Sequence, residues 1–339
     1  MKTAKFSLIS IITGIGIGVI LVACIGAGQS DSENKIDKDV NITSSESSLN
    51  SYFDSIQANY KIYSIPMPVD ANFAGEKVPL ENIIVKEDLD KELLSNTYWH
   101  SNTFYFIKRA NRWFPIIEKI LKEEGVPDDF KYLAVIESGL LNVTSPSGAK
   151  GYWQFMPVTA KGYNLELSKE VDERMNIEKS TRAACTYLKE AYGKFDNWTL
   201  AAASYNMGKT GLMKRLVNQK ADNYYDLLLN AETARYVYRI IAVKYILENP
   251  KNYGFNVRSE DLYYPYQTKS IVIDSTVTSW VNFAINQGSN FKTIKELNPW
   301  LTADGLTNSE GKKYTILLPV KNQGLDNIGT TINKFGSDE

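Results

Sequence analysis

Hydrophobic side chains recur at helical spacing along the middle of this chain, from about residue 94 to residue 255. Over residues 107–124, apolar side chains gather on one helical face, and Gly125 follows as a helix-ending glycine would. The same spacing predicts helices over 127–138, 178–192, 198–207 and 232–247, with Asn197 as the N-cap of the helix over 198–207. No alternating strand pattern is present in this region. We therefore predict a mainly α domain over residues 94–255.

The pattern changes after about residue 263. Short β-rich runs at 270–274 and 314–318 predict two strands, and the apolar spacing over 277–284 and 291–297 predicts two helices between them. This order predicts a small α+β module, strand-helix-helix-strand, over residues 263–322. The polar residues 323–339 predict a flexible tail.

The N-terminus has the pattern of an export signal. Lys2 and Lys5 precede an uncharged run of about 18 residues that ends Leu-Val-Ala-Cys24. This ending resembles a bacterial lipobox, which implies that residues 1–24 are a lipoprotein signal peptide and that Cys24 carries lipid. An uncleaved membrane anchor or a plain signal peptide is the alternative, since the run is near the lower length limit for a membrane span.

The segments after Cys24 differ in composition from the helical region. Residues 25–50 are rich in Gly, Ser, Asp, Asn and Lys, which predicts a disordered tether. Residues 51–93 contain scattered apolar positions and three prolines, which predicts an irregular N-terminal arm that lies on the main domain.

Composition narrows the candidate chemistry. The formal net charge is −1 with no basic cluster, which argues against a nucleic-acid partner. The chain has one histidine, His100, so a zinc site with several histidines is excluded, and no metal or other cofactor is expected. Of the two cysteines, Cys185 lies in a helical pattern and is expected to be a buried small hydrophobe. Any catalysis is therefore expected to depend on carboxylates.

Glu137 is the carboxylate that the pattern singles out. It lies at the predicted C-terminal end of a helix, behind Leu133 and Ile136. The helix dipole and the apolar neighbours both disfavour its ionised form. A carboxylic acid that stays protonated near neutral pH is what glycosidic bond cleavage requires. Because most glutamates at helix ends are simply surface residues, Glu137 alone does not decide the function.

Several segments follow in a fixed order: Glu137-Ser138, Ser145-Pro-Ser-Gly-Ala149, Gly151-Tyr-Trp-Gln-Phe-Met-Pro157, Ala203-Ser-Tyr-Asn-Met-Gly208 and Glu232-Thr-Ala-Arg-Tyr-Val237. Together they resemble the family 1 lytic transglycosylases over residues 95–250, in particular the branch called membrane-bound lytic murein transglycosylase D. That family has a lysozyme-like helical domain of the soluble-lytic-transglycosylase, or goose-lysozyme-like, type. Tyr152 and Trp153 replace its usual Leu-Met, and Ser204 replaces its usual Ala.

The resemblance implies roles for matching residues. Glu137 would be the catalytic acid and then the base, cleaving the bond between N-acetylmuramic acid and N-acetylglucosamine and leaving a 1,6-anhydro end. The substrate-binding residues would be Ser145, Gln154, Tyr205 and Asn206, with Tyr205 also touching Glu137 or the anomeric region. Gly151 would let the backbone approach the glycan, and Glu232 and Tyr236 would brace the site from behind.

The C-terminal module resembles a divergent LysM domain. Asp274-Ser-Thr-Val277 stands where Gly-Asp-Thr-Leu is usual, and Leu297-Asn298-Pro299 matches the common Leu-Asn-Pro. The implied partners are the glycan strands of peptidoglycan and a membrane reached through lipidated Cys24. The implied location is the cell envelope, on a membrane that faces the periplasm, with the outer membrane preferred. We expect a monomer.

Two other functions fit the same sequence. A lysozyme-type hydrolase would need a second carboxylate to activate water. Asp172 and Glu173 are the first candidates for it, although their pattern is typical of surface charges. A catalytically silent peptidoglycan-binding lipoprotein is the other alternative, and an intact Glu137 argues against it.

Overall fold

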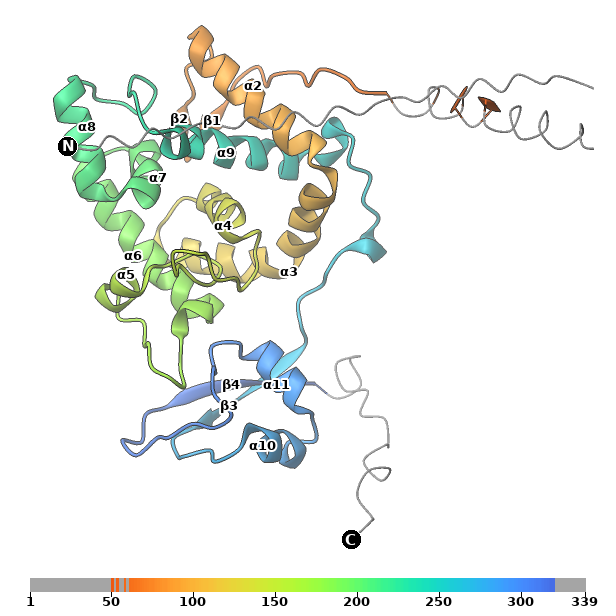
Figure 1. Cartoon of the computed structure of the whole chain (residues 1–339), viewed down its shortest axis with the longest axis vertical. Helices are drawn as coiled ribbons and strands as arrows, with labels where there is room; N and C mark the ends of the chain where they lie inside the picture. Colours follow the sequence, from red (N-terminus) through yellow and green to blue (C-terminus); the bar gives the residue numbers. More distant parts are fainter. Residues whose placement is uncertain (1–49, 52, 55–57, 59–60, 321–339) are drawn as a thin grey trace, which may run out of the picture. The chain divides into compact units, whose positions relative to one another are not determined.

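The computed structural model describes residues 50, 51, 53, 54, 58 and 61–320, and every element discussed here lies in the compact unit Ser64–Glu339. This part is mainly helical, as predicted (Figure 1). In chain order the helices and strands are β1 (Asn72–Phe73), β2 (Glu76–Lys77), α2 (Ile83–Tyr98), α3 (His100–Glu124), the 3-10 turn η1 (Asp128–Phe130), α4 (Lys131–Ser138), α5 (Pro157–Gly162), η2 (Glu173–Met175), α6 (Ile177–Phe195), α7 (Trp198–Met207), α8 (Lys209–Gln219), α9 (Ala231–Glu248), η3 (Pro250–Tyr253), η4 (Ser259–Asp261), β3 (Thr268–Ile273), α10 (Trp280–Asn286), α11 (Phe291–Leu297) and β4 (Tyr314–Pro319).

Helix α9 is the centre of the larger domain. It packs against α2, α4 and α7 (Figure 1). Its buried side chains lie on nearly every side of the helix, which is typical of a helix enclosed by others. The Asn230 side chain accepts a hydrogen bond from the Thr233 amide and so caps its N-terminus. The first residues of α9 are therefore held in a defined position.

The predicted helices around α9 are confirmed. Helix α3 ends at Gly125 in a left-handed conformation, and α6 buries its alanine-rich stripe together with Cys185. Asn197 caps α7 by accepting a hydrogen bond from the Leu200 amide. The α7 face is built of small residues, and this lets α6 and α9 pack closely on it.

The prediction of an irregular arm over residues 51–93 is wrong from Ile83 onward. Residues 83–93 form most of α2, which packs along α9. Its apolar side chains lie on both faces, with Leu89 fully buried and Ile83 and Ile84 exposed, so no clean helical stripe is visible in the sequence. The N-cap Asn82, whose side chain accepts from the Ile84 amide, was the signal that marked the start of this helix.

The segment before α2 is fixed by polar contacts. The Glu76 carboxylate accepts hydrogen bonds from the Trp198 amide at 2.6 Å and the Thr199 amide at 2.9 Å. These are the free donors at the N-terminus of α7, where a carboxylate is favoured. The Ala74 amide donates to Asp129 Oδ2 at 2.7 Å, and Asp129 also pairs with Lys244 of α9 at 2.7 Å. This part of the chain therefore lies on the helical domain.

The C-terminal module has the predicted order of strand, two helices and strand. β3 and β4 pair antiparallel, with Ile271 opposite Ile316. A second hydrophobic core, with Trp280 and Ile294 fully buried, lies under this sheet. Asn298 joins α11 to β4, because its amide donates to Leu317 O at 2.8 Å and its side-chain oxygen accepts from Leu317 N at 2.8 Å.

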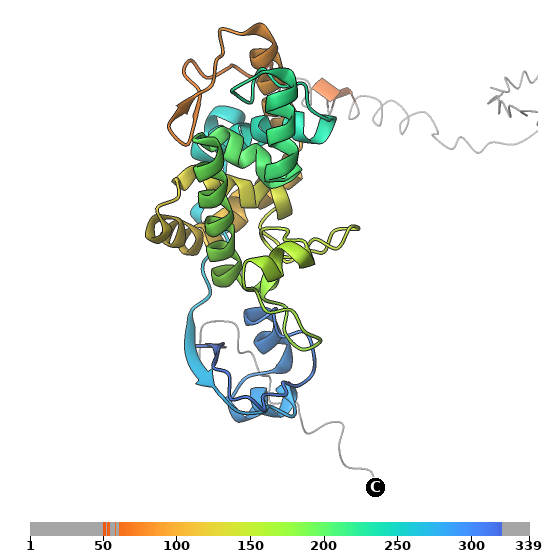
Figure 2. The same cartoon turned by 90° about the vertical axis from the view of Figure 1, so that its left-hand side faces the viewer.

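The module also contacts the loop between α5 and η2 (Figure 2). Val171 pairs with Leu301 in an antiparallel bridge, the Asp172 amide donates to Trp300 O at 2.8 Å, and Thr302 N donates to Glu170 O at 2.9 Å. Val171 is itself a member of the second hydrophobic core. A short piece of the larger domain therefore completes the packing of the smaller one.

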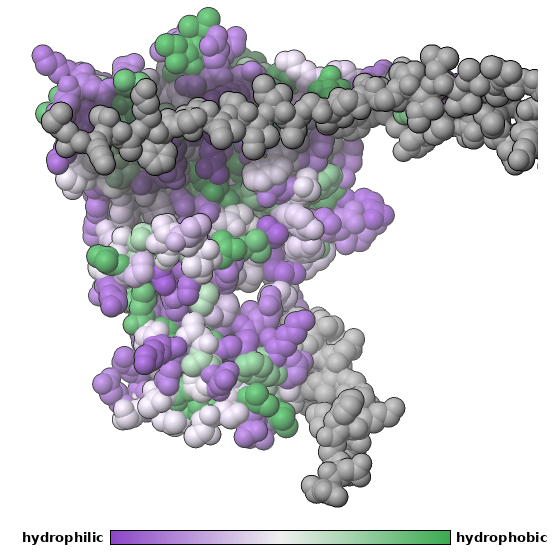
Figure 3. Space-filling view, viewed as in Figure 1, coloured by the Kyte–Doolittle hydropathy of each residue, from purple (hydrophilic) through white to green (hydrophobic). Residues whose placement is uncertain are grey.

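The predicted signal peptide over 1–24 with Cys24, nearly all of the tether over 25–50, and the tail over 323–339 lie outside the described residues. Within the described part, no helix combines the length and apolarity of a membrane span. On the face that Figure 3 shows, hydrophobic residues form small patches between hydrophilic ones.

Asn298 provides a test of this packing. We expect Asn298→Ala to lower the free energy of unfolding by about 2–4 kcal/mol, because the backbone N–H and C=O of Leu317 lose their partner. Chemical denaturation of the whole chain measures it. Asn286→Ala, at the exposed end of α10, is the matched control and should change stability by less than about 0.5 kcal/mol. Equal midpoints for the two variants would contradict the assignment.

Candidate active site

Glu137 lies in the last turn of α4, which Gly139 ends in a left-handed conformation. The Tyr236 hydroxyl, from α9, donates a hydrogen bond to Glu137 Oε1. Burial raises the pKa of Glu137 to about 7, and the charge of Glu232 also raises it, whereas the Tyr236 hydrogen bond and Arg239 lower it. The carboxyl is therefore divided between its acid and its carboxylate near neutral pH, while its side chain keeps some exposed surface.

The hydroxyls of the two site tyrosines have different partners. We predicted that Tyr205 touches Glu137 or the anomeric region and that Tyr236 braces the site from behind. In the structure Tyr236 donates to Glu137, and the Tyr205 hydroxyl donates to Trp153 O at 2.8 Å. Burial, followed by the charge of Glu137, holds the pKa of both phenols well above the ordinary value, so both remain hydrogen-bond donors. Tyr205 therefore fixes the backbone beside the site.

Asn206 and Glu232 join the end of α7 to the start of α9. The Asn206 amide donates to Glu232 Oε1 at 3.1 Å, and Thr233 Oγ1 donates to Asn206 Oδ1 at 2.7 Å. The Glu232 side chain is exposed, yet its charge reaches Glu137. Glu232 is therefore the acidic neighbour that acts on Glu137 electrostatically.

The loop between α4 and α5 carries Ser145 and Gln154. Ser145 closes a turn: its amide donates to Ala149 O at 2.8 Å, and its hydroxyl accepts from Ala149 N at 3.0 Å. Gln154 has a positive φ of 48°. The side-chain Nε2 of Gln154 donates to Gly151 O at 2.8 Å and to Val143 O at 3.0 Å. Both side chains therefore shape the loop on which they lie.

Gly151 is required by the protein's own backbone. Its φ is +83°, and a Cβ at this position would lie 1.9 Å from Arg174 O. We predicted that this glycine lets the backbone approach the glycan. The structure gives it a different constraint, because the space beside its Cα is filled by the backbone of η2.

The expectation that Asp172 and Glu173 are surface charges is wrong. Asp172 is 6% exposed and Glu173 is 4% exposed. Asp172 accepts hydrogen bonds from Arg174 Nε at 2.9 Å and from Arg174 Nη2 at 2.8 Å, and it pairs with Lys150 at 3.1 Å. Glu173 accepts from Glu166 N at 2.8 Å and pairs with Lys179. Each carboxylate therefore has its charge compensated within the fold.

Arg174 is the positioning residue that our reading of the sequence missed. Its guanidinium Nη1 donates to Gly148 O at 2.9 Å and to Phe155 O at 3.1 Å. Along the sequence, these two residues lie on either side of Gly151. Arg174 therefore holds both halves of the loop that carries Ser145 and Gln154. The signal was the acid-base spacing Asp172-Glu-Arg174, just before the helix N-cap Asn176.

A pocket lies next to Glu137 on the helical domain. Its walls come from α2, α3, α4 and α9, and they include Asn96, Phe106, Ile136, Glu232, Arg235 and Arg239. Arg235 forms a bidentate pair with the buried carboxylate of Glu92. Among the described residues, no group of three or more His, Cys, Asp or Glu side chains is arranged to hold a metal ion.

Comparison with protein families decides the classification. Residues 114–228 match the family model described as the transglycosylase SLT domain. The matched range contains Glu137, Gln154 and Tyr205. The chain carries an SLT domain. Residues 269–322 match the soluble lytic transglycosylase C-terminal LysM-like domain, so the predicted LysM-like module is confirmed as well.

Two curated proteins are similar to this chain in sequence. The chain is 30% identical over 198 residues to membrane-bound lytic murein transglycosylase D of Escherichia coli K12, covering 56% of this chain and 43% of that protein. It is 26% identical over 165 residues to a putative tributyltin chloride resistance protein of an Alteromonas species, covering 47% of this chain and 79% of that protein. The match thus spans less than half the length of the Escherichia coli relative.

Two solved structures are also similar to the chain. One is an inactive mutant of the lytic transglycosylase Slt from Pseudomonas aeruginosa, with a TM-score of 0.35 and 20% identity over 44% of this chain and 26% of that chain. The other is the soluble lytic transglycosylase of Escherichia coli, with a TM-score of 0.35 and 20% identity over 45% of this chain and 26% of that chain.

Two glycines of the SLT domain form a matched pair for testing the loop. Both have positive φ, +83° at Gly151 and +88° at Gly148, but only Gly151 has backbone where a Cβ would be placed. We expect Gly151→Ala to cost about 2–5 kcal/mol of stability, from left-handed strain plus overpacking. Gly148→Ala should cost only about 1–2 kcal/mol. Chemical denaturation measures both, and equal losses would show that the contact with Arg174 is unimportant.

The carboxyl pKa of Glu137 offers a second test, with shifts of opposite sign. Tyr236→Phe removes a hydrogen bond that lowers this pKa, so the pKa should rise above its value of about 7. Glu232→Gln removes a negative charge that raises it, so the pKa should fall. NMR titration of the labelled Glu137 carboxyl carbon measures both, and shifts of the same sign in the two variants would contradict this environment.

Proposed function

We propose that this chain is a lytic transglycosylase that cleaves the glycan strands of peptidoglycan without consuming water. The observation that carries the proposal is the carboxyl of Glu137, whose pKa of about 7 suits both proton donation and proton acceptance. The SLT domain and the name of the Escherichia coli relative support the substrate class.

The proposed reaction uses Glu137 twice. As an acid it gives its proton to the oxygen between N-acetylmuramic acid and N-acetylglucosamine, and the bond from that oxygen to muramoyl C1 breaks. As a carboxylate it then takes the proton of the muramoyl C6 hydroxyl, whose oxygen bonds to C1. The product carries a 1,6-anhydro ring, and Glu137 is again protonated. Tyr236, through its hydrogen bond to Oε1, orients the carboxyl during both steps.

The candidate glycan-binding side chains come from two segments of the SLT domain. Ser145 and Gln154 present the loop that Arg174 holds, and Asn206 lies at the end of α7. We propose that these side chains bind the hydroxyl and acetamido groups of the glycan. Tyr205 acts indirectly, because its hydroxyl holds the Trp153 carbonyl.

A lysozyme-type hydrolase needs a second carboxylate to activate water. Asp172 and Glu173 are poor candidates, because both are buried and paired with cations. Glu232 is the remaining candidate, since it is exposed and interacts electrostatically with Glu137. This identifies the variant that separates the two reactions.

A silent binding protein would have no use for the environment of Glu137. Holding a carboxyl pKa near 7 costs stability at neutral pH, since the unfolded chain ionises it freely. We propose further that the protein acts in the cell envelope and is anchored through lipid on Cys24, as its N-terminal sequence indicates.

Digestion of purified peptidoglycan tests the activity. We expect the chain lacking residues 1–24 to release products that end in 1,6-anhydromuramic acid, as identified by mass spectrometry. Glu137→Gln should lower the rate by at least about 1000-fold, because it can neither donate nor accept the proton. Glu232→Gln, the matched control, should keep the anhydro products.

Other outcomes would overturn the proposal. Products heavier by one water molecule, with cleavage lost in Glu232→Gln, would assign a hydrolase in which Glu232 activates water. No cleavage by either the parent chain or Glu137→Gln, with peptidoglycan binding retained, would assign a binding protein.

A further inference from the structure

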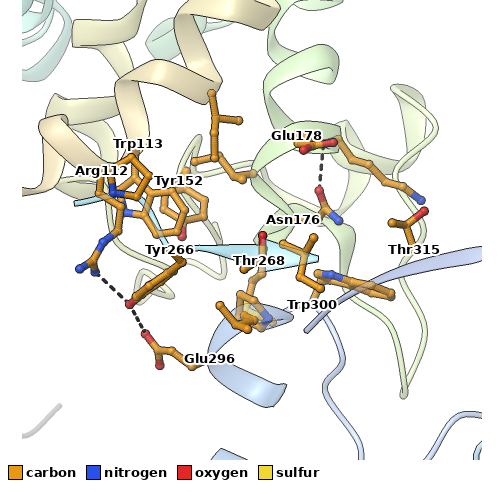
Figure 4. Close-up of a pocket in the computed structure, with 18 of the residues that line it drawn as sticks. Arg112, Trp113, Tyr152, Asn176, Glu178, Tyr266, Thr268, Glu296, Trp300 and Thr315 are labelled. Carbon is orange, nitrogen blue, oxygen red and sulfur yellow. Dashed lines mark hydrogen bonds between the residues drawn. The ribbon is translucent and has the colours of Figure 1, made fainter. Parts of the chain in front are cut away.

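A second cavity lies between the helical domain and the LysM-like module (Figure 4). It has no lining residue in common with the pocket beside Glu137, and its volume is about 250 Å³. It is lined by five aromatic rings, two from the helical domain and three from the chain that follows it: Trp113, Tyr152, Tyr266, Trp300 and Tyr314. The LysM-like motif Asp274-Ser-Thr-Val277 takes no part in its lining.

The rings are held in fixed orientations. Trp113 packs edge-on against Tyr152, with ring centroids 5.1 Å apart, and against Tyr266 at 6.1 Å. On the other wall, Trp300 stacks on Tyr314, with centroids 5.9 Å apart and an angle of 23° between the planes. Flat apolar surfaces are therefore present on both sides of the cavity without rearrangement.

Tyr152 is the residue in this cavity that the fold does not explain. It replaces the Leu of the family pattern, and its side chain is only 4% exposed. Its ring lines the cavity, and no hydrogen bond joins its hydroxyl to another residue in the described part of the chain. A phenol hydroxyl at the wall of a cavity can donate a hydrogen bond to a ligand in that cavity.

Charged and polar groups lie at the edge of the rings. Arg112 Nε donates to Tyr264 O at 2.9 Å, and Arg112 Nη1 donates to the Tyr266 hydroxyl at 2.9 Å. The Tyr266 hydroxyl in turn lies 3.4 Å from Glu296 Oε1. Further along the rim are Asn176 and Thr268 (Figure 4). A ligand here would meet apolar faces at its centre and donors and acceptors at its edge.

A sugar ring has this distribution of groups, with C–H groups on its faces and hydroxyls around its rim. The cavity is smaller than the roughly 300–1,000 Å³ typical of pockets for drug-sized ligands, so it suits one ring. We infer that this cavity is a binding site for a single N-acetylhexosamine unit, separate from the catalytic groove. The choice of N-acetylhexosamine rests on the proposed function, since peptidoglycan glycan consists of such units.

The test uses the full chain with Glu137→Gln, which removes turnover, and N-acetylglucosamine as the probe. We expect saturable shifts of the Trp113 and Trp300 indole signals in NMR spectra, with a dissociation constant on the order of 1 mM for so small a ligand. Tyr152→Phe should weaken binding about 3–10-fold by removing one hydrogen bond. Tyr152→Leu, which restores the residue of the family pattern, should weaken it at least as much.

Three outcomes would overturn the inference. They are unmoved Trp113 and Trp300 signals, equal affinity in the Tyr152 variants, or equal binding of glucose, which lacks the acetamido group. Far-ultraviolet circular dichroism shows whether the variants fold. Cleavage of peptidoglycan by the parent chain with a silent cavity would reject this inference alone, whereas binding in the cavity without any cleavage would reject the proposed lytic activity alone.

Discussion

The buried pair of Asp172 and Arg174 is the interaction on which the rest of the site depends. A guanidinium buried in this position needs a carboxylate, and the bidentate contact of Asp172 provides it. Once neutralised, Arg174 can donate to the carbonyls of Gly148 and Phe155. The same residue's own carbonyl occupies the space beside Gly151. The loop that carries Ser145 and Gln154 is therefore shaped by the turn around Arg174, and the LysM-like module supports that turn through Trp300.

Glu137 illustrates the opposite use of burial. Asp172 is compensated by two cations and its pKa is lowered, although its own burial acts in the other direction. Glu137 receives a phenol hydroxyl and a more distant arginine, so burial prevails and its pKa rises. The pKa values of the two acids are thus shifted in opposite directions, and the difference lies in their partners. Under the proposed function, Asp172 has a structural role and Glu137 is the reacting acid.

Much of this arrangement was predictable from the sequence, and the remainder was not for physical reasons. Helices with one apolar face, such as α3 and α6, were evident, and so was the position of Glu137 at a helix end. Helix α2 was missed because it buries Glu92 and Asn96 and exposes Ile83 and Ile84, which reverses the usual pattern. The hydrogen bond from Tyr236 to Glu137 was not predicted, because sequence spacing does not determine which of two inward tyrosines reaches a carboxyl.

The placement of Val171 affects how the two domains can be separated. The smaller hydrophobic core includes this residue of the larger domain, and Leu301 bridges to its backbone. A gene fragment that begins at the LysM-like boundary would lack one of its core side chains, and the truncated larger domain would expose an apolar side chain with unpaired backbone groups. The two modules are therefore better regarded as one unit of inheritance and of protein engineering. Domain shuffling that respects the sequence boundary would damage both parts.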